Sequence, residues 1–264
     1  MQNDRKVRQK KIIRKGKERL VLITGFSRGI GKEITKRFLK DGYIVVGVAK
    51  NHGDEAKKME KKFSTNLLTY YYDFSDLTNI ESMIKVIKKE KYKFDCVVNN
   101  AGMIEFEKFG DFDMKIWNDT MNVNLNCVLM ICTKLRSNIK SNGSIVNIAS
   151  TDGMIGAYAS MAYAASKAAL INLTKSLSLN YGKYNVRVNS ISPGWINTSM
   201  ATQSSMFATE LSPLSRNGKP EEIANVVAFL CSKEASFITG SNIVVDGGYS
   251  CVDYIMKQEA KEFA

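Results

Sequence analysis

The 264-residue chain is 44% hydrophobic and 24% charged, proportions typical of a soluble globular protein. They exclude a disordered chain, a collagen-like fibre and a disulfide-stapled miniprotein. At roughly 100–200 residues per domain, the length suits one large domain or two small ones. Lysine and arginine outnumber the acids by 38 to 26, a net charge of +12, so nucleic acid and anionic membrane surfaces are candidate partners.

The basic excess is concentrated at the N-terminus. Residues 1–20 contain nine Lys and Arg and two acids, a net charge of +7, which leaves +5 for the remaining 244 residues. The segment has no aromatic residue on which a base would stack, and its Ile12-Ile13 pair is too short for the apolar region of a secretory signal. No apolar run approaches the ~18 residues of a membrane span. We therefore interpret residues 1–18 as a basic N-terminal extension and residues 19–264 as one folded domain, and we expect neither a nucleic-acid partner nor a transmembrane segment.

Cysteine and histidine usage indicates the compartment and argues against a metal. The five cysteines are odd in number and form no C-x-x-C pair, and the chain has a single histidine, His52. A metal site needs clustered ligands of these types, so we expect none. Reduced, mostly buried thiols are typical of a cytoplasmic protein, and that is the location we expect. The cysteines are Cys96, Cys127, Cys132, Cys231 and Cys251.

Short apolar runs alternate with longer helical patterns along the domain. Residues 19–24 predict a strand, followed by a glycine-rich turn and a helix over 32–40. The further expected elements are strands at 43–49 and 67–72, a helix over 80–89, a strand over 96–98, a helix over 114–135, a strand at 143–149, a helix over 158–181, a strand at 186–191, a helix over 221–231 and a strand at 242–246.

The expected strands are continuous apolar runs, which indicates strands buried on both faces of a sheet. Strands that alternate with helices favour right-handed βαβ units and a parallel sheet. The sequence therefore predicts the α/β class: a single Rossmann-type, doubly wound parallel sheet of about seven strands with helices on both faces.

The first strand leads into the turn Thr24-Gly25-Phe26-Ser27-Arg28-Gly29-Ile30-Gly31, which a helix follows. A dinucleotide pyrophosphate binds backbone N–H groups at a helix N-terminus where no Cβ stands in the way. Gly25 permits the tight turn, Gly29 allows close approach, and Gly31 lets the helix pack on the strand. The spacing predicts a dinucleotide site; the alternative is a purely structural turn.

The end of the second strand should distinguish NAD from NADP. An acidic residue there would bind the ribose 2′-hydroxyl, and a basic one would accept a 2′-phosphate. Val48-Ala49-Lys50-Asn51 contains no acid, and Arg28 in the glycine turn is a second cation beside Lys50. We expect NADP(H) in preference to NAD(H); the alternative is that both cations are ordinary solvated charges.

Tyr163 and Lys167 stand four residues apart, one above the other on an expected helix face. The ordinary tyrosine pKa of about 10 is too high for easy proton exchange near neutral pH. A nearby ammonium is expected to lower it, which suits a general acid or base for carbonyl and alcohol interconversion. Ser150, at the end of a strand, would bind the substrate oxygen, and the Asn124 amide would hold a water that links Lys167 to solvent.

Taken together, these motifs resemble the short-chain dehydrogenases/reductases. The resemblance implies that Tyr163 is the acid/base, Lys167 lowers its pKa and holds the nicotinamide ribose, Ser150 orients the substrate and Asn124 completes the proton relay. The matches span residues 21–248 and include T-G-x-x-x-G-I-G at 24–31, N-N-A-G at 99–102, Asn124, Ser150, Tyr163 with Lys167, P-G-x-x-x-T at 193–198, and V-D-G-G at 245–248.

The resemblance also implies the cofactor contacts and the assembly. Asp73 and Phe74 would contact the adenine, and the loop after the strand at 186–191 would hold the carboxamide end. Members of the family are usually tetramers or dimers, so a homotetramer or a dimer is expected. The full implied cofactor set is Gly25, Ser27, Arg28, Gly29, Ile30, Gly31, Lys50, Asn51, Asp73, Phe74, Asn100, Ala101, Gly102, Tyr163, Lys167, Pro193, Gly194, Ile196 and Thr198.

The substrate is left open between two enzymatic interpretations. The first is an NADPH-dependent reductase that converts a ketone into a secondary alcohol, similar to the 3-oxoacyl-[acyl-carrier-protein] reductases. Those enzymes dock an acyl carrier on basic residues flanking the site, for which this chain offers Arg136, Lys140 and Lys183, with Ser141 and Tyr184 nearby.

The second interpretation is a dehydrogenase or reductase of a sugar, polyol or secondary-metabolite alcohol. Asp152 favours it, because a carboxylate stands where apolar or small residues are usual, and so does the rather short loop from Trp195 to Ser215. The expected substrate contacts are Ser150, Asp152, Tyr163 and Trp195, with Met200 and Met206 adding an apolar wall. A third, remote alternative is a catalytically idle cofactor-binding scaffold, which would predict a broken tetrad, yet all four positions are intact.

Overall fold

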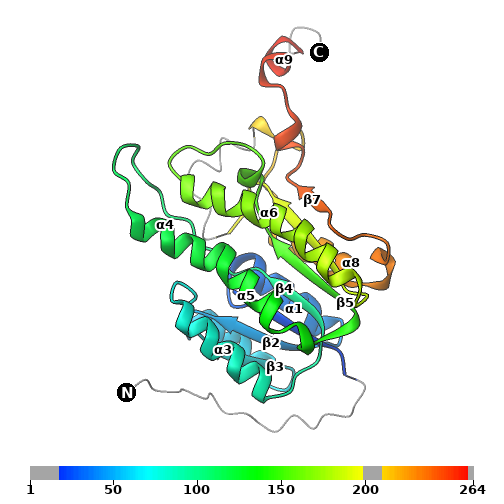
Figure 1. The fold of residues 1–264 in the computed structure, drawn as a ribbon. Helices are drawn as coiled ribbons and strands as arrows, with labels where there is room; N and C mark the ends of the chain where they lie inside the picture. The colour runs from blue at the N-terminus through cyan, green and yellow to red at the C-terminus, as the bar shows by residue number, and fades with distance from the viewer. Residues whose placement is uncertain (1–17, 199–209, 261–264) are drawn as a thin grey trace.

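The computed structural model describes residues 18–198 and 210–260. Seven strands form one parallel sheet in the order β3-β2-β1-β4-β5-β6-β7 (Figure 1). This confirms the predicted doubly wound sheet; apart from Glu18, the expected basic extension lies outside the described residues, as do Met200 and Met206. The strands are β1 (Leu20–Thr24), β2 (Ile44–Ala49), β3 (Leu67–Tyr71), β4 (Phe94–Asn99), β5 (Ile139–Ile148), β6 (Arg187–Pro193) and β7 (Asn242–Val245).

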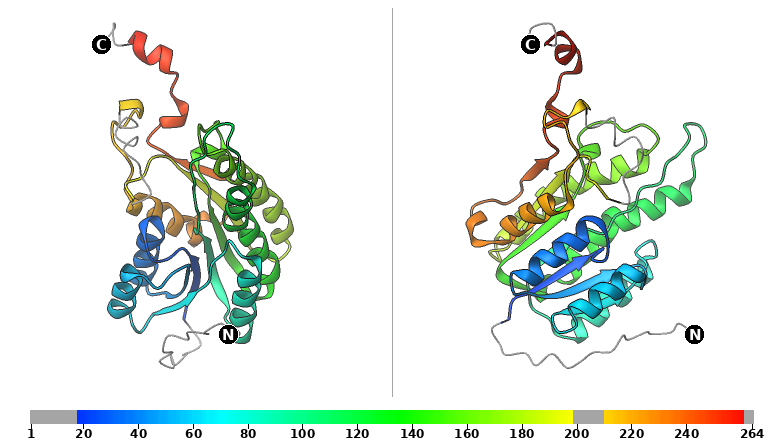
Figure 2. Two further views of the ribbon diagram at one scale, coloured as in Figure 1. Left: turned by 90° about the vertical axis from the view of Figure 1, so that its left-hand side faces the viewer. Right: turned by 180° about the vertical axis from the view of Figure 1, so that it is seen from behind.

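Helices cover both faces of the sheet (Figures 1 and 2). One face packs against α1 (Gly29–Lys40), α2 (Asp54–Lys62) and α8 (Pro220–Cys231). The other packs against α3 (Leu77–Lys89), α5 (Cys127–Lys134) and α6 (Met161–Gly182). The chain also forms α4 (Met114–Met121) before α5, and α9 (Tyr254–Glu259) near its C-terminal end, where Figure 1 shows it projecting from the body.

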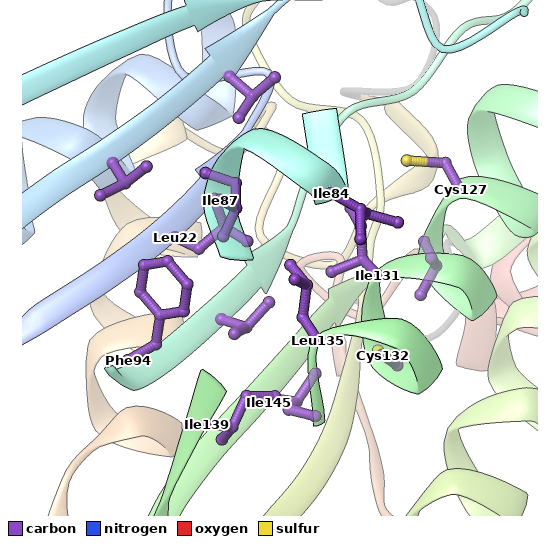
Figure 3. Packing of buried hydrophobic residues seen from close by; sticks show 14 of the residues in the cluster. Leu22, Ile84, Ile87, Phe94, Cys127, Ile131, Cys132, Leu135, Ile139 and Ile145 are labelled. Carbon is purple, nitrogen blue, oxygen red and sulfur yellow. The ribbon is translucent and has the colours of Figure 1, made fainter. Parts of the chain in front are cut away.

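The strands are buried on both sides because successive side chains enter different cores. In β1, whose five residues are all buried, Leu20 and Leu22 belong to the cluster under α3, α5 and α6, whereas Val21 and Ile23 belong to the cluster under α1, α2 and α8. Figure 3 shows the first cluster, in which Ile84 and Ile87 of α3 approach Ile131 of α5 and Leu135, the residue that follows α5. This explains the uninterrupted apolar runs in the sequence.

Several elements differ from the sequence expectation, among them α9, which was not expected, and β5, which begins at Ile139 rather than at 143. Helix α2 was not expected, since only Ala56 and Met59 of its nine residues are buried and the apolar stripe is thin. The helix expected over 114–135 is interrupted by a π-helical turn at Asn122–Asn126. The helix expected from 158 begins at Met161, because Ala159 takes a left-handed backbone conformation with φ of 56°.

The sheet order reverses between β1 and β4, which places β2 on one side of β1 and β4 on the other. At such a switch point the crossover connections leave in opposite directions and a crevice opens at the carboxyl ends of the strands. Within 18–198 and 210–260, no helix is long and apolar enough to cross a membrane, and no three His, Cys, Asp or Glu side chains gather as metal ligands would.

Candidate active site

The glycine turn after β1 is clamped by the segment that follows β4. The Thr24 hydroxyl accepts hydrogen bonds from the backbone N–H groups of Asn100 and Ala101, each at 3.0 Å. The Asn100 side-chain amide donates to the carbonyls of Thr24 at 3.0 Å and Gly25 at 3.2 Å. These bonds fix the two loops at the switch point against each other, so Asn100 orders the turn itself.

Each glycine of the turn has different steric surroundings, which decide whether a side chain would fit there. Gly25 has a φ of +70°, and a Cβ there would lie 2.8 Å from the Asn100 amide nitrogen. At Gly31 a Cβ would lie 2.0 Å from the Gly25 carbonyl oxygen, so helix and turn exclude any side chain. At Gly29 the nearest atom would be a Thr198 methyl at 3.5 Å, which leaves ordinary contact space beside the helix N-terminus.

This arrangement fits a dinucleotide pyrophosphate. The residue that precedes α1, Arg28, makes no side-chain cap bond to the first turn, whose N–H groups an anion would satisfy. The positive end of the helix dipole favours the same ligand. The turn therefore meets the steric and electrostatic demands of the cofactor predicted from the sequence.

The segment expected to hold the adenosine carries an ion pair that the sequence did not predict. Lys50 lies 2.8 Å from Asp73, and Asp73 also accepts hydrogen bonds from the N–H and hydroxyl of Ser75 at 3.0 and 2.9 Å. Burial opposes ionisation of Asp73, but the bonds from Lys50 and Ser75 outweigh it and hold its pKa below the ordinary value. Lys50 is thus oriented toward a carboxylate, whereas Arg28 is an exposed cation in the turn itself.

The other expected adenosine-side residues differ in environment. Phe74 is 5% exposed and belongs to the core under α3 and α5, so it is a packing residue. Ile30 packs against the opposite core, and Asn51 is exposed. Ser27 lies half-buried in the turn.

The four expected catalytic residues converge at the carboxyl ends of β4 and β5. Ser150 follows β5, and its hydroxyl lies near enough to Tyr163, on the first turn of α6, to lower the pKa of the phenol. The Lys167 ammonium donates to the Ile148 carbonyl at 2.8 Å and lies 5.4 Å from the centre of the Tyr163 ring. Because Lys167 is only 3% exposed, this bond holds it in place within the site.

Asn124 is held by the π-helical turn between α4 and α5. Its side-chain oxygen accepts from the Met103 N–H at 2.9 Å, and its nitrogen donates to the Met103 carbonyl at 3.0 Å and the Ser166 hydroxyl at 2.9 Å. A Cβ on Gly102 would lie 3.6 Å from both Asn124 Oδ1 and Lys167 Nζ, so the two groups flank the same point. Single π-helical turns of this kind occur frequently at functional sites.

Burial controls the protonation of the site. It raises the pKa of Tyr163 to about 12, against the hydrogen bond from Ser150, while the Asp152 charge adds to the rise. Burial lowers the pKa of Lys167 to about 8, and the Asp152 carboxylate acts in the opposite sense. The expected lowering of the Tyr163 pKa is therefore wrong for this structure, because desolvation of the phenolate is the dominant effect.

Asp152 lies in a short 3₁₀ turn, Thr151–Gly153, packed against α6. Its backbone N–H donates to the Ser150 hydroxyl at 3.1 Å. Burial raises the pKa of its carboxyl group, and the Lys167 charge opposes that rise. A Cβ on Gly153 would lie 2.7 Å from the Lys167 backbone, which keeps the turn close to the catalytic helix.

The loop after β6, which is expected to hold the nicotinamide end of the cofactor, packs between the C-terminal strand region and the glycine turn. Gly194 donates its N–H to the Val245 carbonyl at 3.0 Å, and a Cβ there would lie 2.6 Å from that of Asp246. Gly218 donates to the Trp195 carbonyl at 2.9 Å, and Ile196 is 8% exposed. These contacts, with the approach of Thr198 to Gly29, bring the predicted segment 193–198 beside the glycine turn.

The basic residues expected to flank the site lie at the opposite ends of the strands from the site. Arg136 precedes β5, and Lys183 and Tyr184 lie between α6 and β6, at the amino ends of strands whose carboxyl ends form the site. The Arg136 guanidinium and the Lys183 ammonium approach the Tyr184 ring at 4.2 and 5.2 Å. At ~3.3 Å per residue, the ten residues of β5 separate this cluster from Ser150 of the same subunit.

Comparisons with known proteins agree with this geometry. The profile of the family described as "Enoyl-(Acyl carrier protein) reductase" matches residues 25–250. The chain is 36% identical over 237 residues to the 3-oxoacyl-[acyl-carrier-protein] reductase FabG of Buchnera aphidicola, covering 88% of this chain and 97% of that protein. It is 34% identical over 242 residues to an NAD-dependent glycerol dehydrogenase of Listeria innocua, covering 88% and 94%.

Solved structures give the same result. A 4-hydroxyisoleucine dehydrogenase complexed with NADH superposes with a TM-score of 0.82 at 32% identity, covering 89% of this chain and all of that one. A short-chain dehydrogenase/reductase from Brucella melitensis, described as a glucose/ribitol dehydrogenase, gives 0.82 at 31% identity, covering 88% and 96%. With the sheet order, the glycine turn and the Ser150, Tyr163 and Lys167 cluster, these matches establish that the chain belongs to the short-chain dehydrogenase/reductase family, whose members bind a nicotinamide cofactor.

Proposed function

We propose that the protein is an NADPH-dependent oxidoreductase that reduces a ketone to a secondary alcohol, with Tyr163 as the general acid. The observation that carries the proposal is the placement of Tyr163 next to Ser150 and above the buried Lys167, whose ammonium lies beside Gly102 in the segment that clamps the glycine turn. The raised pKa keeps Tyr163 protonated near neutral pH, and hydride addition turns the carbonyl oxygen into an alkoxide that is basic enough to take a proton from so weak an acid. In the reverse reaction the same group accepts the proton.

Each residue of the site has a separate role in the proposed reaction. Tyr163 delivers its proton to the carbonyl oxygen, and the Ser150 hydroxyl holds that oxygen. When bound, the reduced nicotinamide supplies the hydride. Lys167, whose ammonium is fixed by Ile148, has two further N–H groups for Tyr163 and the nicotinamide ribose, and Asn124 holds a water that connects Lys167 to solvent.

The cofactor preference rests on charge at the adenosine end. The residue after β2 is Lys50 rather than an acid, which removes the usual partner of a ribose 2′-hydroxyl. Because Lys50 is paired with Asp73, we assign the larger share of 2′-phosphate binding to Arg28, and to Lys50 the neutralisation of Asp73 beside it. Both effects favour NADP(H) over NAD(H).

Two substrate classes are compatible with this chemistry. Sequence similarity to 3-oxoacyl-[acyl-carrier-protein] reductases supports a 3-oxoacyl thioester. Asp152, which acts electrostatically on Tyr163 and Lys167, supports a sugar, polyol or secondary-metabolite alcohol instead, because a carboxylate binds hydroxyl groups. In either case Ser150, Asp152, Tyr163 and Trp195 would contact the substrate.

Exposed apolar side chains support a homotetramer or a dimer. Leu129 of α5 is 41% exposed, Leu179 of α6 is 83% exposed, and Val244 of β7 is 37% exposed. These apolar side chains lie on the helices that carry the site and on the last strand, the elements on which we expect subunits to associate.

The test is turnover of the purified protein with NADPH and with NADH against 3-oxoacyl thioesters, ketosugars and small ketones. The proposal expects reduction of at least one class and faster turnover with NADPH. Absence of turnover with every class and both cofactors, in a protein that binds cofactor, would favour the idle-scaffold alternative.

A further inference from the structure

Glu107 is a buried carboxyl group without a partner. It lies on the loop between β4 and α4 and is 6% exposed. Among the described residues, neither of its carboxylate oxygens accepts a hydrogen bond, and it takes part in none of the ion pairs. Removing a carboxylate from water without a donor in exchange is strongly unfavourable, so the site calls for a donor from beyond the described residues.

The loop that carries Glu107 begins at the catalytic cluster and contacts the segment that precedes Tyr163. It starts at Gly102, which lies between Asn124 and Lys167. At Glu107 itself the backbone N–H donates to the Ala159 carbonyl at 2.7 Å. Ala159 belongs to the loop from Ser150 to α6, four residues before Tyr163, and Figure 1 shows the two loops at the same end of the molecule.

We propose, resting on the proposed function, that Glu107 binds a hydroxyl or ammonium group of the substrate. The substrate is then a ketone, or its alcohol, that carries a second, hydrogen-bond-donating group apart from the reacting carbon. Asp152 on the facing loop adds a second carboxylate near the reacting groups. Two acids on neighbouring loops favour neutral polar or cationic substrates and disfavour anionic ones.

The chemistry of an unpaired acceptor explains why such a residue would select its substrate. A ligand with a donor satisfies the buried carboxylate, whereas an analogue with a methyl group in that place leaves the carboxylate desolvated and unpaired. Sites built this way discriminate strongly against the analogue without the donor, whereas apolar pockets discriminate weakly between similar shapes. Glu107 would therefore determine specificity without taking part in proton transfer.

The experiment uses methyl ketones of three chain lengths that differ only in their terminal group: hydroxyl, ammonium, methyl or carboxylate. Steady-state kcat/KM is measured for the wild-type protein, for Glu107→Gln and for the control Glu105→Gln. Glu105 lies two residues earlier on the same loop but is exposed, so it makes the same charge change outside the pocket. Glu107→Leu, which fills the space without polar atoms, replaces Glu107→Gln should that variant fail to fold.

The proposal expects the wild type and Glu105→Gln to prefer a hydroxyl- or ammonium-terminated ketone over its methyl counterpart by about tenfold or more. Glu107→Gln should reduce that ratio by about tenfold, mainly through KM, because the donor-bearing ketone loses its charge-assisted hydrogen bond and the methyl ketone no longer leaves a buried charge unpaired. Equal use of all terminal groups by the wild type, or an unaltered ratio in the Glu107 variants, would overturn the inference. Failure to reduce any ketone would instead count against the proposed function, so the two failures are distinguishable.

Discussion

Lys50 and Asp73 form a 2.8 Å ion pair across the carboxyl ends of β2 and β3. The register of the two strands places them there, since the Tyr72 N–H donates to the Ala49 carbonyl at 2.9 Å immediately before the pair. The pair neutralises an acid at the adenosine end and leaves Arg28 as an exposed cation at the pyrophosphate turn. It therefore changes which residue should dominate cofactor choice.

Arg28→Ala should weaken NADPH binding by about tenfold or more, because a charge-assisted bond to the 2′-phosphate is lost. NADH binding should change much less. Lys50→Ala should also discriminate against NADPH, but by a smaller factor, since it frees Asp73 to repel the phosphate. Fluorescence titration with both cofactors measures this, with Lys57→Ala on exposed α2 as control; equal losses for NADPH and NADH would refute the 2′-phosphate assignment.

Ketone reduction should decline as the pH rises above about 8, where Lys167 loses its proton. Tyr163, with a pKa of about 12, stays protonated through this range and is not the cause of the decline in activity at alkaline pH. Asp152→Asn removes the carboxylate that raises the Lys167 pKa, so the alkaline limb of kcat should move to lower pH. A limb that stays in place in Asp152→Asn would show that Asp152 does not act on Lys167.

Substitutions at two glycines of the turn should affect different properties, stability at Gly31 and cofactor binding at Gly29. Gly31→Ala forces a Cβ to 2.0 Å from the Gly25 carbonyl and should lower the free energy of unfolding by about 1–3 kcal/mol or prevent folding. Gly29→Ala meets nothing closer than 3.5 Å, so its stability cost should be about 1 kcal/mol, from its positive φ. Its cofactor binding should nevertheless be lost.

Gly42→Ala separates these effects. Gly42 has a φ of +80° with no atom within 4 Å of its added Cβ, so this variant carries the backbone strain alone. Thermal unfolding and cofactor titration of all three variants measure the contrast. Undiminished cofactor binding in Gly29→Ala would contradict the assignment of the turn to the pyrophosphate.

The sequence predicts the sheet well because its strands are buried on both faces and appear as unbroken apolar runs. It also predicts which residues converge on the site, since the carboxyl ends of parallel strands meet at one edge. It misses α2, whose burial is confined to Ala56 and Met59. It misses the π-helical turn at Asn124 too, because the apolar period of the surrounding helices continues through it.

Features that depend on long-range contacts were beyond the sequence. The Lys50–Asp73 pair requires the register of β2 against β3, and the burial of Glu107 requires its loop to meet Ala159. The pKa of Tyr163 depends on the extent of burial around it, which outweighs the lowering effect of the Ser150 hydroxyl. Arg136 and Lys183 were expected beside the site, but strand length alone carries them to the other edge of the sheet.

Tyr163 donates the proton to the carbonyl oxygen in the proposed ketone reduction. Tyr163→Phe removes only the hydroxyl, and Tyr158→Phe, at a side chain 99% exposed, is the matched control. Single-turnover reduction of a ketone by prebound NADPH should slow by about 10²–10⁴-fold in Tyr163→Phe, with NADPH affinity unchanged and Tyr158→Phe like wild type. A Tyr163→Phe variant that binds NADPH and reduces the ketone at the wild-type rate would contradict the role of Tyr163 as proton donor.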